Sequence, residues 1–212
     1  MPFSSVCAMI LFSFGVMQVS ELLTSLYFQE VQQLSALDSS LRFLPSLIMG
    51  ATLNLTTGLI VHRVPAAWLL VITSALSAGS PLLMAVINKN WPYWYDAFFA
   101  QLLQPMSVDV LFTVGLLIVS ETFPMRTQSL AGAVFNTISQ FGQALGLAII
   151  SVISSSVTRN AQGKEQLVKA SPAALLEGYQ AGFWTSFAWM AIVCCIGAFG
   201  LRKVGRVGLK RD

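Results

Sequence analysis

The sequence predicts an all-α integral membrane protein with six transmembrane helices. The first observation is composition: the 212 residues are 55% hydrophobic and only 10% charged, with a mean hydropathy of +0.71. Soluble domains carry about 25% charged residues, so the chain is far too apolar for that class. The second observation is that the chain divides into six apolar runs, each close to the roughly 20 residues that a spanning helix needs.

The six predicted spans are separated by breaks of uneven length. They cover about residues 3–27, 42–61, 66–87, 94–119, 129–152 and 179–201, and a basic tail follows at 202–212. The longest predicted break runs from 154 to 178. The first span lacks the positively charged start and small-residue cleavage site of a signal peptide, so it predicts a membrane helix that begins abruptly. We therefore expect that an upstream portion of the protein is missing.

The orientation of the spans is predicted from Lys and Arg, which favour cytoplasmic loops. A cytoplasmic C-terminal tail places seven of these residues inside: Arg63, Arg126, Arg202, Lys203, Arg206, Lys210 and Arg211. Five then lie outside: Arg42, Lys89, Arg159, Lys164 and Lys169. Because the tail alone supplies five of the seven, charge gives this orientation little support.

The second and fifth spans carry polar stripes at helical spacing. Ser46, Gly50, Asn54 and Gly58 recur every four residues on the second span, and Asn136, Gln140 and Gln143 share a face on the fifth, one turn after Gly132. Gly142 and Gly146 form a GxxxG pair, a pattern typical of close helix packing. The amides predict either hydrogen bonds between helices or a water-filled or ligand-lined cavity, and their spacing does not separate the two.

The fourth span contains an aspartate in mid-membrane. Gln101, Pro105, Asp109 and Thr113 repeat at four-residue intervals, and Gln104 precedes the proline. A central aspartate costs about 2.5–3.5 kcal/mol on insertion scales, so it predicts either a proton-coupling residue or a hydrogen-bonded helix contact. Pro105 removes a backbone hydrogen bond near Gln101 and allows a bend.

The first span adds two polar residues, Gln18 and Glu21, which lie three apart on one face. Glu21 is nearer the end of the span, so it predicts a solvated position at the mouth of a cavity or a cavity-lining residue.

The sequence contains no recognisable set of catalytic residues. His62 is the one histidine, no phosphate-binding glycine loop or HExxH motif is present, and Cys7, Cys194 and Cys195 lack metal-ligand spacing. The net charge of +3 is too small and too scattered to predict nucleic-acid binding. The sequence therefore predicts a protein that is not an enzyme, binds no metal and needs no cofactor, and transport is the favoured class.

Three stretches resemble a known family. "LLQPMSVDVLFTVGLLIVSETFP", "QSLAGAVFNTISQFGQALGLAI" and "LYFQEVQQLSALDSSLRFLPSLIMGATLNLTTGLIV" are similar to the late spans of fungal fourteen-helix drug–proton antiporters of the major facilitator superfamily. This group contains aminotriazole-resistance-like and secondary-metabolite efflux pumps. The resemblance covers nearly the whole chain and identifies it as the C-terminal half of such a transporter.

The resemblance implies a six-helix bundle made of two inverted three-helix units, with substrate bound near the midplane between two bundles. It marks Pro105, Asp109, Asn136 and Gln140 as candidates for the cavity or a helix interface, and Gly58 and Arg63 as a degenerate copy of the family's cytoplasmic loop motif. His62 stands where the family often has an aspartate.

The implied partners are the lipid bilayer, a small organic substrate and a missing N-terminal bundle in cis or in trans, with a proton gradient as the coupling force. The expected location is the plasma membrane, with a vacuolar or other internal membrane as the alternative. The alternative function is a transport-incompetent six-helix protein that acts only by assembly with another bundle.

Overall fold

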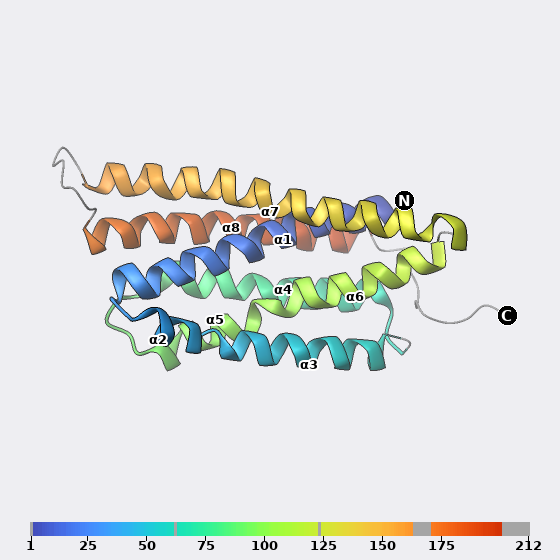
Figure 1. Cartoon of the computed structure of the whole chain (residues 1–212), viewed down its shortest axis with the longest axis horizontal. Coiled ribbons are helices and arrows are strands. Elements are labelled where there is room, and N and C mark those ends of the chain that lie inside the picture. The colour runs from blue at the N-terminus through green and yellow to red at the C-terminus, as the bar shows by residue number, and fades with distance from the viewer. Residues whose placement is uncertain (1, 62, 123, 163–170, 201–212) are drawn as a thin grey trace.

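The computed structural model describes residues 2–61, 63–122, 124–162 and 171–200, and these form helices and short connections without a strand (Figure 1). The elements are α1 (Pro2–Leu26), η1 (Tyr27–Val31), α2 (Ala36–Leu41), α3 (Leu44–Ile60), α4 (Ala66–Val86), η2 (Tyr93–Tyr95), α5 (Ala97–Leu103), α6 (Pro105–Thr122), α7 (Met125–Gln162) and α8 (Pro172–Gly200). Six of the resulting helical stretches are long and apolar enough to cross a membrane, which confirms the predicted number of spans.

Several helices extend beyond the predicted spans. The stretch 154–178, predicted as a break, is helical as far as Gln162 and again from Pro172, and α2 occupies part of the predicted break at 29–40. Apolar composition locates the part of a helix that lies in hydrocarbon, whereas backbone hydrogen bonding continues wherever side chains allow it. The hydroxyl-rich stretch after Ile153 is therefore compatible with helix although its polarity ended the predicted span. The predicted tail lies outside the described residues.

The helices pack as two related sets of three. α1 contacts α6, α7 and α8, while the α5–α6 stretch contacts α1, α3 and α4. α4 packs against α8, and the two halves differ in one respect, since α7 packs closely against α8 whereas α3 makes little contact with α4. The contacts of α1 and of the α5–α6 stretch are those expected when the first three spans and the last three form an inverted repeat. α1 begins at the same end of the bundle where α8 finishes (Figure 1).

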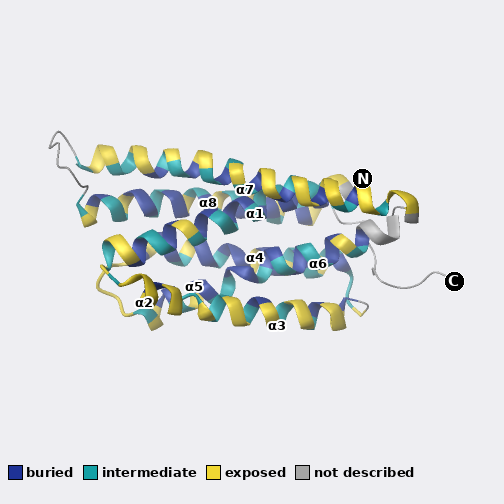
Figure 2. Cartoon of the chain, viewed as in Figure 1, coloured by how far each residue is buried: buried dark blue, intermediate teal, exposed yellow. Residues whose placement is uncertain are grey.

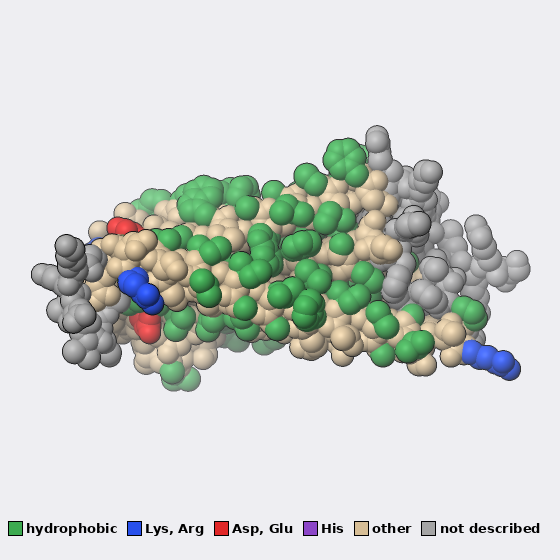
Figure 3. Space-filling model, turned by 90° about the horizontal axis from the view of Figure 1, so that it is seen from above, with side chains coloured by type: hydrophobic (Ala, Val, Ile, Leu, Met, Phe, Trp, Pro, Cys, Tyr) green, Lys and Arg blue, Asp and Glu red, His purple; other side chains and the backbone are tan. Residues whose placement is uncertain are grey.

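The core lies along α1, α4 and the α5–α6 stretch, whereas α3 and α7 are peripheral (Figure 2). In each of the three core spans, about half of the residues in the most apolar 18-residue stretch are buried. The corresponding share is 6% for Ala36–Ile60 and 22% for Arg126–Gln162. On the face seen in Figure 3, hydrophobic side chains cover the length of the molecule and the charged side chains lie toward its ends. That distribution matches a bilayer around the helices and water at both ends.

Two glycines set the distance between α1 and α7. A Cβ atom at Gly142 would lie 2.1 Å from the carbonyl oxygen of Leu11, and one at Gly146 would lie 2.6 Å from that of Gly15. The two backbones are therefore in direct contact, the packing that the GxxxG spacing predicts. Gly132, one turn before the amides of the same helix, has nothing within 4 Å of such an atom and takes no part in the contact.

Candidate functional site

A groove of about 550 Å³ opens between α1, α3 and α6. Its apolar wall includes Met17, Phe43, Leu44 and Leu47. Its polar wall combines side chains from all three helices: Glu21 from α1, Ser46 and Asn54 from α3, and Asp109 from α6. The groove thus mixes an apolar lining with a few convergent polar groups, as small-molecule sites do.

Asp109 lies directly against α3. A Cβ atom at Gly50 would be 2.7 Å from Asp109 Oδ2, so the absence of a side chain at Gly50 makes room for the carboxyl group. Asn54 Nδ2 donates to the Gly50 carbonyl at 3.0 Å. The Thr113 hydroxyl lies 3.2 Å from Asn54 Oδ1 and 2.9 Å from the Asp109 carbonyl oxygen. The polar stripes predicted on the second and fourth spans therefore face each other.

The helix is interrupted where Pro105 predicts a bend. α5 ends at Leu103 and α6 begins at Pro105, with Gln104 between them. Proline has no amide hydrogen, so the carbonyl four residues earlier, on Gln101, has no intrahelical donor. Nearby, the Ser77 hydroxyl of α4 donates to the Gln104 carbonyl at 3.1 Å, which ties the break to a neighbouring helix.

Gln101 and Gln104 do not line the groove, although the sequence places them beside Asp109. Both are buried in the bundle, at 1% and 5% exposure. A four-residue step turns an α-helix by about 400°, so each step drifts about 40° from the starting face. Gln101 also lies on α5, before the break at Gln104, whereas Asp109 lies on α6, so the two side chains do not share one continuous helical face. On α1, Glu21 lines the groove and Gln18 does not.

The amides of α7 lie apart from this groove. Asn136 and Gln140 are exposed on the bundle surface and Gln143 is half-buried. Gly58 and Arg63 are also exposed, near the α3–α4 turn, and His62 lies outside the described residues. Exposed amides at membrane depth require water or another protein surface, because lipid offers them no hydrogen-bonding partner.

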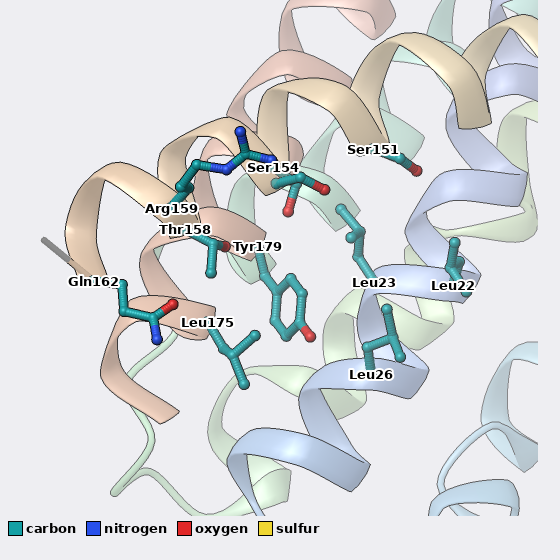
Figure 4. Close-up of a pocket in the computed structure, with 11 residues that line it drawn as sticks. Leu22, Leu23, Leu26, Ser151, Ser154, Thr158, Arg159, Gln162, Leu175 and Tyr179 are labelled. Atoms are coloured by element: carbon teal, nitrogen blue, oxygen red, sulfur yellow. The ribbon is translucent and has the colours of Figure 1, made fainter. Parts of the chain in front are cut away.

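A second pocket, of about 360 Å³, lies between α1, α7 and α8 and was not predicted (Figure 4). Leu22, Leu23 and Leu26 of α1 form its apolar side. Hydroxyl and charged groups come from α7, namely Ser151, Ser154, Ser155, Thr158 and Arg159, and Tyr179 comes from α8. The spacing of these hydroxyls at three- and four-residue intervals was the available signal, but it falls mostly in the stretch predicted as a break. Tyr179 also donates a hydrogen bond to Glu30.

Charged and aromatic groups gather at one end of the bundle. The Arg42 guanidinium lies 5.1 Å from the ring centres of both Phe28 and Tyr93, and it donates to Gln32 Oε1 at 2.5 Å. Asp96, directly before the spanning stretch Ala97–Ile118, is 3% exposed, and burial raises the pKa of its carboxyl group from 3.8 to about 6. Burial likewise raises the pKa of the Tyr93 phenol, and the nearby positive charge of Arg42 partly offsets this rise.

Within the described ranges, no three His, Cys, Asp or Glu side chains are placed to hold a metal ion.

Comparisons with known proteins place the chain among membrane transporters. No family model matches it. It is 42% identical, over 97% of its length, to MFS-type transporter 1 of Pyricularia oryzae, and 25% identical, over 71%, to a major facilitator superfamily multidrug transporter of Aspergillus fumigatus. It is 24% identical, over 87%, to the aminotriazole resistance protein of Saccharomyces cerevisiae.

The chain spans between a quarter and about a third of the length of these relatives, at 36%, 25% and 31%. The helical architecture, the six spans and these similarities agree. The chain therefore belongs to the major facilitator superfamily and is related to its fungal transporters and efflux pumps over a stretch consistent with the C-terminal half of such a protein.

Proposed function

We propose that this chain forms one bundle of a proton-coupled efflux transporter for small, largely apolar organic compounds. The observation that carries the proposal is the groove in which Asp109, Asn54 and Glu21 meet an apolar wall. The names of the relatives, a multidrug transporter and an aminotriazole resistance protein, favour export of small organic molecules.

Asp109 is the residue that we assign to proton coupling. It is half-buried in a spanning helix, yet its carboxyl group borders an open groove, so a proton can reach it without crossing the core. A carboxylate only accepts hydrogen bonds, whereas the protonated acid also donates one. Loading a proton at Asp109 would therefore change its interaction with the α3 backbone at Gly50 and with the nearby Asn54 amide, and so the contact between α3 and α6.

The groove supplies one wall of the transport path in this proposal. A second bundle, in cis or in trans, would supply the opposite wall, and the exposed amides Asn136 and Gln140 would face that bundle or the water between the two. We place the transporter in the plasma membrane with the C-terminus in the cytoplasm. The proton gradient is then the energy source and no other cofactor takes part.

The test measures export in proteoliposomes that contain the full-length gene product carrying this chain. Asp109→Asn is expected to abolish export driven by a pH gradient while substrate binding and protein yield are retained. Gly50→Ala keeps the carboxyl group but introduces a Cβ atom 2.7 Å from it, so pH-driven export should fall without being lost. The control is Glu177→Gln, which removes an exposed carboxylate near the start of α8 and should leave export unchanged.

If the Asp109→Asn variant still exports substrate with the normal dependence on pH, the proton-coupling role of Asp109 is contradicted. Loss of folded protein, rather than of export, would favour the alternative in which Asp109 holds α3 to α6. If the chain instead acts only by assembly, a separately expressed bundle should co-purify with it and no export should be measurable.

A further inference from the structure

A small enclosed cavity lies in the core of the bundle beside the α5–α6 break. Its volume is about 10 Å³, and residues of α1, α4, α6 and α8, together with Gln104 at the break, line it. Four of the lining residues are serines: Ser13 and Ser20 of α1, and Ser77 and Ser80 of α4. Each of these hydroxyls needs a hydrogen-bonding partner inside the core, whereas an apolar side chain would fill the space without one.

Two polar atoms at this cavity have no hydrogen-bond partner among the residues that the structure describes. They are Ser20 Oγ and Gln104 Nε2, and their side chains are 2% and 5% exposed. The neighbouring hydroxyls are already engaged, since Ser77 donates to the Gln104 carbonyl and Ser13 lies 3.2 Å from the Ser107 hydroxyl. The two side chains come from different helical elements, α1 and the α5–α6 break, and both elements border the same cavity.

The size of the cavity fits one water molecule. A cavity of about 10–15 Å³ is the smallest that holds a water molecule. The water also needs two to four polar partners. Gln104 Nε2 can donate to a water oxygen and Ser20 Oγ can accept from it or donate to it, while the Ser80 hydroxyl is a third polar group in the lining. A solute larger than water does not fit.

We propose that this cavity is a binding site for a single ordered water molecule that bridges Ser20 of α1 to Gln104 at the α5–α6 break. Proline inside a transmembrane helix is tolerated where neighbouring hydroxyls and ordered water satisfy the polar groups that it disturbs. The water lies in a cavity that shares one lining residue, Met17, with the groove that contains Asp109. It joins α1 to the interrupted helix through an exchangeable bridge, which lets α5 and α6 change angle without exposing unpaired polar atoms to the core.

The test is X-ray hydroxyl-radical footprinting of the protein in lipid nanodiscs. Radiolysis of a bound water produces radicals within the core, where they can oxidise the thioether of Met190, which lines the cavity and is 1% exposed. Met17 also lines the cavity, but it borders the open groove as well and so does not report on the bound water alone. Met9 and Met84 are equally buried, at 0% and 1% against 1% for Met190, but neither lines the cavity. We expect Met190 to form sulfoxide several-fold faster than Met9 and Met84.

Two variants connect that signal to the site. Ser20→Val removes one partner and adds a methyl group to the space, so Met190 oxidation should fall to the level of Met9. Gln104→Leu should have the same effect through the other partner. Ser25→Val makes the matched change on α1 outside the cavity and should leave Met190 oxidation unchanged. Equal oxidation of the three methionines in the unmodified protein would overturn the proposal, and that comparison requires no variant to fold.

Discussion

The contact between α1 and α7 leads to a prediction whose magnitude follows from the geometry. A Cβ atom at Gly142 would lie 2.1 Å from the Leu11 carbonyl oxygen, and real Cβ atoms essentially never approach closer than 3.0 Å. Gly142→Ala must therefore move the two backbones apart by at least the difference, 0.9 Å. Because the obstructing atom belongs to the backbone of a long helix, side-chain rotation cannot relieve the clash.

The matched control is Gly132→Ala on the same helix, where nothing lies within 4 Å of the added atom. Both substitutions gain about 1 kcal/mol of intrinsic helix propensity, so that gain cancels when they are compared. The remaining difference is the cost of overpacking, about 1–3 kcal/mol. Gly142→Ala should thus melt below Gly132→Ala by roughly 2–4 °C for each kcal/mol in a chain of this size.

The assay is thermal unfolding of the purified protein in detergent, followed by tryptophan fluorescence. Trp189 is a suitable reporter because its ring lies 5.4 Å from that of Phe12 on α1 and 3.4 Å from a Cβ atom placed at Gly15. Separation of the helices should also shift its emission. A melting temperature for Gly142→Ala equal to or above that of Gly132→Ala would refute the close approach of the two backbones.

Two further predictions concern the end of the bundle. Burial raises the Asp96 pKa from 3.8 to about 6, so the folded protein binds this proton more tightly than the unfolded chain. Stability should decrease as pH rises from about 4 through 6 and then level off. The unscreened shift corresponds to about 3 kcal/mol, which solvent screening reduces, and Asp96→Asn should remove the decrease in melting curves taken across this range. Arg42→Lys keeps the charge but loses the planar group that lies over Phe28 and Tyr93, so we expect a loss of about 1–2 kcal/mol in the same assay. Arg63→Lys, at an exposed position, should have no effect, and an equal loss there would contradict the role assigned to Arg42.

Much of the architecture follows from the sequence because lipid imposes so few choices. A chain with six long apolar runs must cross as helices, since only helices and closed barrels satisfy every backbone group in hydrocarbon. The interruption at Pro105 follows from proline's missing amide hydrogen, and the close helix packing at Gly142 follows from the spacing of small residues. An aspartate at position 109 had to turn away from lipid for the same energetic reason.

The sequence did not determine which polar faces meet. Helical spacing shows that residues share a side of one helix, but it does not show which neighbour that side contacts. Packing brought Asn54 to Asp109 across α3 and α6, and it left Asn136 and Gln140 on a surface remote from both. The break at Gln104 separates Gln101 on α5 from Asp109 on α6, and Gln101 lies in the core and not at the groove.

The sequence by itself thus determined the membrane environment, the number of spans and the family, because these depend on composition and on local spacing. Only the tertiary structure decided that Gly50 makes room for the Asp109 carboxyl group, that Gln104 turns inward to a serine-lined cavity and that a second pocket forms beside Arg159. Each of these depends on the rotation of one helix about its axis relative to another. That rotation is set by the close packing of side chains from distant parts of the chain.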